Sequence, residues 1–324
     1  MTEQELNELA DEIVARIGER RGARVGGRRQ AAGGSIGAPI VRGALALKPD
    51  PTGAADIAWR GPSAKTAAWT PEQGARRVAD FVDHTLLKAE ATKAEIVKLC
   101  AEAKEHRFAA VCVNPTWVEL CVKELRGTEV AVATVVGFPL GATTRRAKAF
   151  EAREAVATGA GEIDMVAAIG RIKSGLWQCV EDDIREVALA SRPALVKVII
   201  ESAVLTTEEI IKVSALAKEA GANFVKTSTG FHPAGGASVQ AVRLMRLVVG
   251  DDLGVKASGG VRDCQTALAM IAAGANRIGT SSGVGMVTCL GPGPLPLAEL
   301  LKAPHAHGAK CTSGTCESAG GGQY

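Results

Sequence analysis

Residues 224–230, Phe-Val-Lys-Thr-Ser-Thr-Gly, and residues 254–260, Gly-Val-Lys-Ala-Ser-Gly-Gly, share one pattern: a strand-like run, a lysine and a glycine turn. A lysine that points into a packed interior loses hydration, which favours its neutral amine, and a second ammonium nearby disfavours the charged form further. A neutral amine at pH 7 is a nucleophile toward carbonyls. The alternative is that both lysines end surface strands and keep their ammonium groups in water. Because the same pattern occurs in two successive units, a catalytic role for Lys226 and Lys256 is favoured over that alternative.

Strand-like runs similar to these two recur through residues 70–300. Helical segments separate the runs, and neighbouring runs start roughly 20–35 residues apart, the length of one strand, one helix and two short loops. The eight runs are residues 81–84, 110–114, 130–136, 163–166, 195–201, 224–227, 255–257 and 277–280. The pattern predicts a (β/α)8 TIM barrel of the α/β class. An open doubly wound sheet is the alternative, but its usual phosphate fingerprints, G-x-G-x-x-G and G-x-x-x-x-G-K-[ST], are absent from the sequence.

The two ends of the chain differ in pattern from the barrel. Residues 1–20 predict an amphipathic helix, in which Thr2 and Glu5 can form a capping box. The apolar residues that recur at helical spacing there are Leu6, Leu9, Ala10, Ile13, Val14 and Ile17. Residues 21–69, rich in Gly, Arg, Ala and Pro, predict a flexible linker, and residues 301–324 predict a disordered tail.

Composition argues against several classes of function. The 324 residues carry a formal net charge of +3 and only 3% aromatic residues, which leaves few rings to stack on bases and predicts no nucleic-acid partner. No apolar run reaches the ~18 residues that span a bilayer, and the N-terminus lacks a signal-peptide pattern, so we expect no membrane partner and a cytoplasmic location. Six of the eight cysteines are scattered singly through apolar segments, which fits a reducing compartment. We therefore expect a small-molecule substrate.

Ionisable residues interrupt four adjacent predicted strands. They are Asp164, Lys197, Lys226 and Lys256. Catalytic groups of TIM barrels lie at the C-terminal ends of the strands, where inward positions alternate with outward ones. We expect the four side chains to share one side of the interior, where the carboxylate would offset part of the amine charge and could carry protons. A plain structural ion pair between Asp164 and Lys197 is the alternative.

Two turns rich in glycine and serine follow the last two predicted strands. They are Ser258-Gly259-Gly260 and Gly279-Thr280-Ser281-Ser282-Gly283. Loops at these positions of TIM barrels often bind phosphate through backbone N–H groups, because glycine permits close approach and serine adds hydroxyl donors. The turns therefore predict a phosphorylated substrate.

These motifs together resemble the deoxyribose-phosphate aldolases, a family of class I Schiff-base enzymes with the barrel fold. The resemblance covers roughly residues 75–285. The segments that carry it are Asp83-His84-Thr85-Leu86-Leu87-Lys88, Val111-Cys112-Val113-Asn114-Pro115, Gly137-Phe138-Pro139-Leu140-Gly141, Glu162-Ile163-Asp164-Met165-Val166, Lys197-Val198-Ile199-Ile200-Glu201, Lys226-Thr227-Ser228-Thr229-Gly230 and Lys256-Ala257-Ser258-Gly259-Gly260-Val261-Arg262.

The resemblance implies reversible cleavage of 2-deoxy-D-ribose 5-phosphate to acetaldehyde and D-glyceraldehyde 3-phosphate, with no metal and no cofactor. It assigns imine formation to Lys226, depression of the nucleophile's pKa and assistance with proton transfer to Lys256, and general acid/base work to Asp164. A protonated imine is an electron sink for the carbanion equivalent that forms as the carbon–carbon bond breaks. The substrate-binding residues that the resemblance implies are Asp83, Thr85, Lys197, Thr229, Gly259, Gly260, Ser281 and Ser282.

Other functions remain open at this point. Departures from the family's more frequent residues occur at Glu201-Ser202-Ala203 and Phe231-His232-Pro233, and they could shift the substrate preference. A phosphosugar isomerase or a transaldolase-like enzyme would have the same fold, and a non-enzymatic scaffold is a third candidate. The scaffold is disfavoured because it needs no paired amines in its interior.

The N-terminal helix suggests a partner of its own. Residues 2–17 resemble the encapsulation helices that direct enzymes into bacterial microcompartments, which implies shell proteins as partners and a location inside such a compartment. A helix of this length needs a surface on which to bury its apolar face. Docking on its own barrel or on a sister subunit is the alternative. We also expect the enzyme to be a homo-oligomer.

Overall fold

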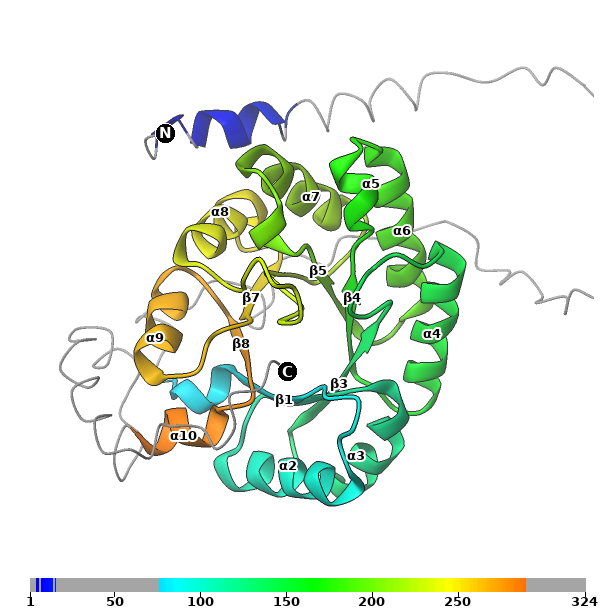
Figure 1. The fold of residues 1–324 in the computed structure, drawn as a ribbon, viewed down its shortest axis with the longest axis vertical. Coiled ribbons are helices and arrows are strands. Elements are labelled where there is room, and N and C mark those ends of the chain that lie inside the picture. Colours follow the sequence, from blue (N-terminus) through cyan, green and yellow to red (C-terminus); the bar gives the residue numbers. More distant parts are fainter. Residues whose placement is uncertain (1–3, 6, 14, 16–75, 290–324) are drawn as a thin grey trace, which may run out of the picture.

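Eight parallel strands close into one barrel in the computed structural model, which describes residues 76–289 and the helical residues 4, 5, 7–13 and 15. Each strand pairs with the next one in the chain, and the last pairs with the first (Figure 1). The strands are β1 (Val82–Leu86), β2 (Ala110–Val113), β3 (Ala131–Val136), β4 (Glu162–Val166), β5 (Leu195–Ile199), β6 (Phe224–Lys226), β7 (Gly254–Ser258) and β8 (Arg277–Thr280). The predicted (β/α)8 TIM barrel is confirmed, since every strand overlaps the run that predicted it.

Helices surround the barrel and connect its strands (Figure 1). The α-helices are α2 (Lys93–His106), α3 (Val118–Glu124), α4 (Arg145–Ala157), α5 (Ile169–Lys173), α6 (Trp177–Ala190), α7 (Thr207–Glu219), α8 (Val239–Val249), α9 (Cys264–Ala272) and α10 (Gly283–Thr288). Short 3-10 helices are η2 (Val78–Phe81), η3 (Pro115–Trp117) and η4 (Ser202–Val204). A capping box of Thr92 and Glu95 begins α2, and the same motif, formed by Thr206 and Glu209, begins α7.

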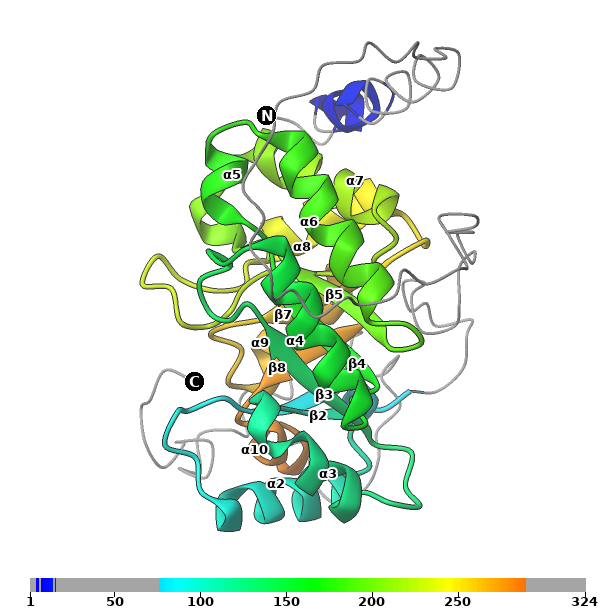
Figure 2. The same cartoon turned by 90° about the vertical axis from the view of Figure 1, so that its right-hand side faces the viewer.

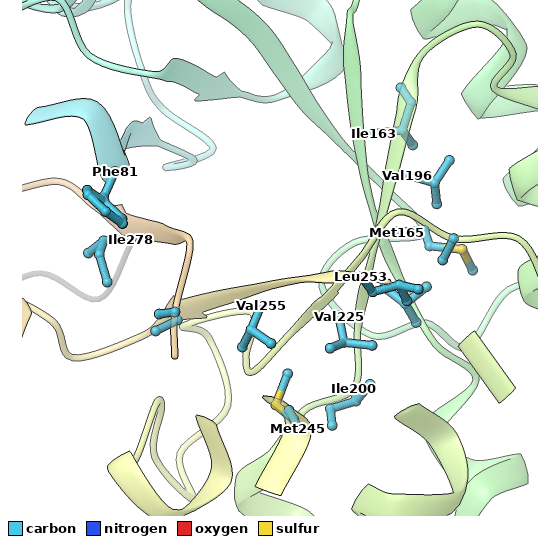
Figure 3. Close-up of a cluster of buried hydrophobic side chains, with 14 of the residues drawn as sticks. Phe81, Ile163, Met165, Val196, Ile200, Val225, Met245, Leu253, Val255 and Ile278 are labelled. Atoms are coloured by element: carbon cyan, nitrogen blue, oxygen red, sulfur yellow. The ribbon is translucent and has the colours of Figure 1, made fainter. Parts of the chain in front are cut away.

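Outward-facing strand residues form the apolar layer between the strands and the helices. Ile163 and Met165 of β4, Val225 of β6 and Val255 of β7 are completely buried in this layer. Figure 3 shows these side chains with Met245, which α8 contributes from the helical side. Because side chains of a strand alternate between its two faces, the residues next to these apolar positions point into the barrel.

The inside of the barrel has an apolar part and an ionic part. Small apolar side chains line it at β2 and β3, as a cluster separate from the main core: Ala110, Cys112, Ala133 and Val135. Phe224, at the start of β6, is completely buried. A Cβ at Gly254 would lie 2.0 Å from the Phe224 ring, so the glycine leaves the space that the ring fills. The charged side chains of the remaining strands occupy the other part.

The helical residues near the N-terminus lie on the outside of the barrel, next to α7 in both views (Figures 1 and 2). Ala10 and Ile13 are 3% and 6% exposed and belong to the main hydrophobic cluster, against which Leu9 packs. α7 is buried at residues 210–211 and 213–217, which lie on more than one of its faces. The described part of the apolar stripe therefore rests on the protein's own barrel.

The predicted linker, residues 21–69, and the predicted tail, residues 301–324, lie outside the described residues. The elements of the barrel, from η2 to α10, fall within the predicted range of 70–300. Among the described helices, we find none with the length and apolar character needed to cross a membrane.

Lys148 and Asp183 form a buried ion pair that joins α4 to α6 outside the barrel. Lys148 Nζ lies 2.7 Å from Asp183 Oδ2 and donates a second hydrogen bond to the carbonyl of Val166 at 2.8 Å.

We expect Lys148→Met to lower the free energy of unfolding by about 3–5 kcal/mol, because the Asp183 carboxylate would stay buried without its partner. Lys148→Met/Asp183→Leu should recover most of that loss in urea unfolding. Equal stability of the single and double variants would contradict the explanation.

Candidate active site

Lys226 and Lys256 are direct neighbours inside the barrel, because the register of β6 and β7 pairs them. Lys226 is 2% exposed and Lys256 is completely buried. The Nζ atoms of both lysines lie 2.8 Å from the same atom, Oδ2 of Asp164. The structure thus brings together the three side chains that the sequence singled out, and the two amines share one carboxylate oxygen.

Lys197 holds the other oxygen of the same carboxylate. Its Nζ donates to Asp164 Oδ1 at 2.7 Å, and the register of β4 and β5 places the two residues opposite each other. Lys197 Nζ also lies 2.6 Å from Glu162 Oε2. Lys197 is completely buried between these carboxylates, and its contact with a substrate stays a prediction.

Two further side chains, Arg277 and Asp83, connect these contacts into a closed loop. Arg277 Nη2 lies 2.8 Å from Glu162 Oε2, and Arg277 Nε lies 2.5 Å from Asp83 Oδ1. Asp83 Oδ2 in turn lies 2.5 Å from Lys256 Nζ, which returns to Asp164. We call the seven groups the interior ion network: Asp83, Glu162, Asp164, Lys197, Lys226, Lys256 and Arg277.

The three lysines of the network differ in acidity. Burial lowers the pKa of Lys226, and the neighbouring Lys256 ammonium lowers it further, while Asp164 offsets only part of this effect. Burial also opposes the charged form of Lys256, but Asp164 and Asp83 outweigh it and raise the pKa of Lys256 well above its ordinary value. Asp164 and Glu162 likewise outweigh burial and raise the pKa of Lys197. Among the three lysines of this network, Lys226 is therefore the one whose neutral amine is favoured.

The carboxylates remain ionised in spite of their burial. Burial alone would raise the pKa of Asp164, but Lys197, Lys226 and Lys256 reverse the effect and hold that pKa well below its ordinary value. Arg277 and Lys256 do the same for Asp83, whose pKa is lowered although its side chain is completely buried. Both oxygens of Asp83 face cations of the network, so its predicted contact with a substrate also stays a prediction.

The two turns predicted to bind phosphate lie side by side, because β7 and β8 are neighbouring parallel strands. Gly259 and Gly260 have φ angles of 84° and 79°, in the left-handed region that glycine adopts without strain. Ser281 is exposed and Ser282 is half-buried where α10 begins. The arrangement brings backbone and hydroxyl groups of two adjacent loops together at the C-terminal end of the barrel.

A buried glutamate positions the loop after β6. Glu201, in the left-handed region at φ 55°, accepts a hydrogen bond of 2.6 Å from the Thr229 hydroxyl and another of 3.2 Å from the Thr229 N–H. The Thr229 hydroxyl oxygen accepts from the N–H of Phe231, whose ring meets Phe138 edge to face at a centroid distance of 5.1 Å. Thr85 lies apart from this loop, and its hydroxyl donates to the carbonyl of Asp83.

Sequence reasoning did not identify Glu162, Arg277 or Glu201 as members of the site. Glu162 precedes Asp164 by two residues, so the period of two in a strand places both on the inward face. The same period would place Arg277 inward, two residues before Gly279. The contact between Glu162 and Arg277 had no such signal, because β4 and β8 lie on opposite sides of the barrel.

Comparison with known proteins places these residues in an established family. Residues 77–288 match the family described as DeoC/LacD family aldolase. A deoxyribose-phosphate aldolase of Geobacillus sp. (strain WCH70) is 59% identical over 211 residues, which are 65% of this chain and 94% of the relative. A deoxyribose-phosphate aldolase of Streptococcus uberis (strain ATCC BAA-854 / 0140J) is 56% identical over 211 residues, or 65% of this chain and 96% of the relative.

A solved structure shows the same similarity in three dimensions. The tetrameric deoxyribose phosphate aldolase from Aeropyrum pernix has 32% sequence identity and a TM-score of 0.60. The similarity covers 65% of this chain and 89% of that one. The family match over residues 77–288 includes all seven residues of the interior ion network.

Proposed function

The chain belongs to the DeoC/LacD family of aldolases, and we propose that it is a class I aldolase that reversibly cleaves 2-deoxy-D-ribose 5-phosphate to acetaldehyde and D-glyceraldehyde 3-phosphate. One observation carries the chemistry: two buried lysines share one oxygen of Asp164, and the pKa of Lys226 is lowered while that of Lys256 is raised. The name shared by the curated relatives supports this substrate over the isomerase and transaldolase-like alternatives.

Lys226 acts as the nucleophile in this proposal. Its amine attacks the C1 aldehyde of the open-chain sugar, and loss of water from the carbinolamine gives a protonated imine. A base then removes the proton of the C3 hydroxyl, and the electrons of the C2–C3 bond move into the imine as D-glyceraldehyde 3-phosphate leaves. The remaining enamine takes a proton at C2, and water releases acetaldehyde and restores the amine.

Lys256 and Asp164 handle charge and protons beside that amine. The Lys256 ammonium disfavours protonation of Lys226, and the Asp164 carboxylate touches both nitrogens, so it can pass a proton between them. The lowered pKa of Asp164 keeps its carboxylate ionised between the two nitrogens, whereas the raised pKa of Lys256 keeps that amine charged. Both roles need the short distances that the shared oxygen provides.

The substrate phosphate is proposed to bind the adjacent turns after β7 and β8. Gly259 and Gly260 would present backbone N–H groups, and Ser281 and Ser282 would add donors from the next loop. Thr229, fixed by Glu201, lies in the loop that follows the nucleophile's strand and is proposed to contact the sugar. In this proposal the substrate crosses the mouth of the barrel, with its aldehyde at Lys226 and its phosphate at the two turns.

Trapping of the imine tests the nucleophile. We expect sodium borohydride with stoichiometric acetaldehyde to leave one N-ethyl group on Lys226, because reduction fixes the imine that forms at the most nucleophilic amine. Peptide mass spectrometry locates the modification, and Lys226→Met, which keeps a long uncharged side chain without a nucleophile, serves as the matched control. An adduct at another residue of the active protein, or no adduct at all, would overturn the assignment.

Charge at the second turn tests the phosphate site. We expect Ser282→Asp to raise KM for deoxyribose 5-phosphate by about tenfold or more, because a carboxylate repels the phosphate by on the order of 1.4 kcal/mol. KM for unphosphorylated deoxyribose should change little. Ser282→Asn, similar in size but uncharged, controls for shape. Equal changes with the two sugars would show that the substitution disturbs the site in another way.

A homo-oligomer in the cytoplasm is the proposed form of the enzyme, and the tetrameric Aeropyrum pernix relative supports the assembly. Three apolar side chains, Leu140, Phe150 and Leu176, are 73%, 57% and 51% exposed in the single chain. An interface would remove such side chains from water.

Binding of residues 2–17 to the shell of a bacterial microcompartment is a further proposal, supported by the amphipathic pattern of the sequence. The burial of Ala10 and Ile13 on the barrel supports the alternative, a helix that packs on its own protein. An address function therefore requires the helix to leave the barrel and expose its apolar stripe. The linker predicted over residues 21–69 would allow that release.

Deletion of residues 1–20 separates the two roles. If the helix is an address, the truncated enzyme should keep its activity and melting temperature and lose co-sedimentation with shell proteins. If it is a packing element, the melting temperature should fall, because α7 would expose apolar surface. Leu9→Asp/Ile13→Asp in the full-length chain is the matched control for the deletion. Co-sedimentation of the truncated enzyme with shells would exclude the address function.

A further inference from the structure

The charges of the interior ion network do not balance when every member is ionised. The network contains four basic groups, Lys197, Lys226, Lys256 and Arg277, and three acidic groups, Asp83, Glu162 and Asp164. Every member is less than 10% exposed. A net charge in a buried site is costly, so loss of one proton from a basic group is favoured.

The contacts of each basic group decide which one loses the proton. Lys197 touches two carboxylates, those of Asp164 and Glu162. Lys256 also touches two, those of Asp164 and Asp83, and Arg277 touches both Asp83 and Glu162.

Lys226 differs from the other basic groups of the network. Among the described ion pairs it has one carboxylate contact, with an Asp164 oxygen that it shares with Lys256. Loss of a proton from Lys226 therefore costs less electrostatic stabilisation than loss of a proton from any other basic group of the network. The geometry thus makes Lys226 the neutral member.

We propose that Glu162 and Arg277 are positioning residues that set the protonation of Lys226 from a distance, by fixing the net charge of the interior ion network. The inference rests on the proposed function, in which the Lys226 amine must be neutral to attack. Neither Glu162 nor Arg277 is among the ion-pair contacts of Lys226. Glu162 lies two residues before Asp164 in β4, one layer deeper toward the N-terminal ends of the strands.

The neighbours of the network leave this charge count unchanged. Burial raises the pKa of the Cys112 thiol, which faces the lysines from β2 and stays neutral. Arg76 lies close enough to Arg277 for the two cations to interact, but Asp80 offsets the charge of Arg76. Asp80 also bonds to Arg77, which is partly exposed to water. Arg76, Arg77 and Asp80 stay the same in every variant of the network, so their charges cannot cause a difference between those variants.

Two single substitutions should shift the activity profile in opposite directions. Arg277→Met removes one cation, so the network becomes neutral with Lys226 protonated, and the pKa of Lys226 should rise. Glu162→Gln removes one anion, so the pKa of Lys226 should fall further. The acidic limb of kcat/KM against pH reports this group in the free enzyme. We expect the limb to move by about one to two pH units, upward for Arg277→Met and downward for Glu162→Gln.

The double variant Glu162→Gln/Arg277→Met restores the charge count. Its acidic limb should return to within a few tenths of a pH unit of the wild type, although both side chains are gone. Arg277→Lys keeps the charge with a different shape and should leave the limb in place. A merely structural role would lower activity in all four variants without opposite shifts or compensation. If Arg277→Met does not fold, the downward shift of Glu162→Gln and the return in the double variant decide the question.

Failure of the charge-balance inference can be distinguished from failure of the proposed function. If wild-type protein forms no borohydride-trapped adduct at Lys226, the proposed function is wrong and this inference falls with it. If the adduct forms but both single variants keep the wild-type limb, or shift it in the same direction, the aldolase assignment stands and the charge-balance inference is overturned. The rate of adduct formation at fixed pH, measured in the same variants, gives an independent readout of the neutral amine.

Discussion

The charge that the barrel can bury is the constraint on which the rest of this site depends. Register places three basic side chains in one row across β6, β7 and β8, namely Lys226, Lys256 and Arg277. Desolvation and mutual repulsion would make such a row prohibitive without carboxylates at hydrogen-bonding distance. Asp164 from β4 and Asp83 from β1 supply them, and each touches more than one cation.

Closure of the barrel makes this compensation geometrically available. β1 and β8 lie at opposite ends of the chain's strand order but pair directly, which brings Asp83 within 2.5 Å of Arg277. An open sheet with the same strand order would separate them by the full width of the sheet. The apolar layer around Ile163 and Val225 holds the strands in this register from outside, because a shift of one residue would turn the ionic side chains toward the helices.

Local patterns in the sequence were sufficient for the fold and for the inward orientation of the key lysines. The prediction extended the fifth strand to residue 201, whereas β5 ends at Ile199. Glu201 adopts φ 55°, which no regular strand can continue, and it does so while its carboxylate holds Thr229. Strand propensity could not predict the left-handed backbone at Glu201, since the partner of its carboxylate, Thr229, lies 28 residues further along the chain.

The sequence by itself determined the eight strands, their alternation and the presence of lysines where strands 5, 6 and 7 face inward. Only the tertiary structure decided how the acidities of these lysines differ. Lys197, Lys226 and Lys256 occupy similar positions in apolar strands, yet the pKa of Lys226 is lowered and the other two are raised. The physical reason is the number of carboxylates that each ammonium reaches, and those carboxylates come from strands that only the closed barrel brings together.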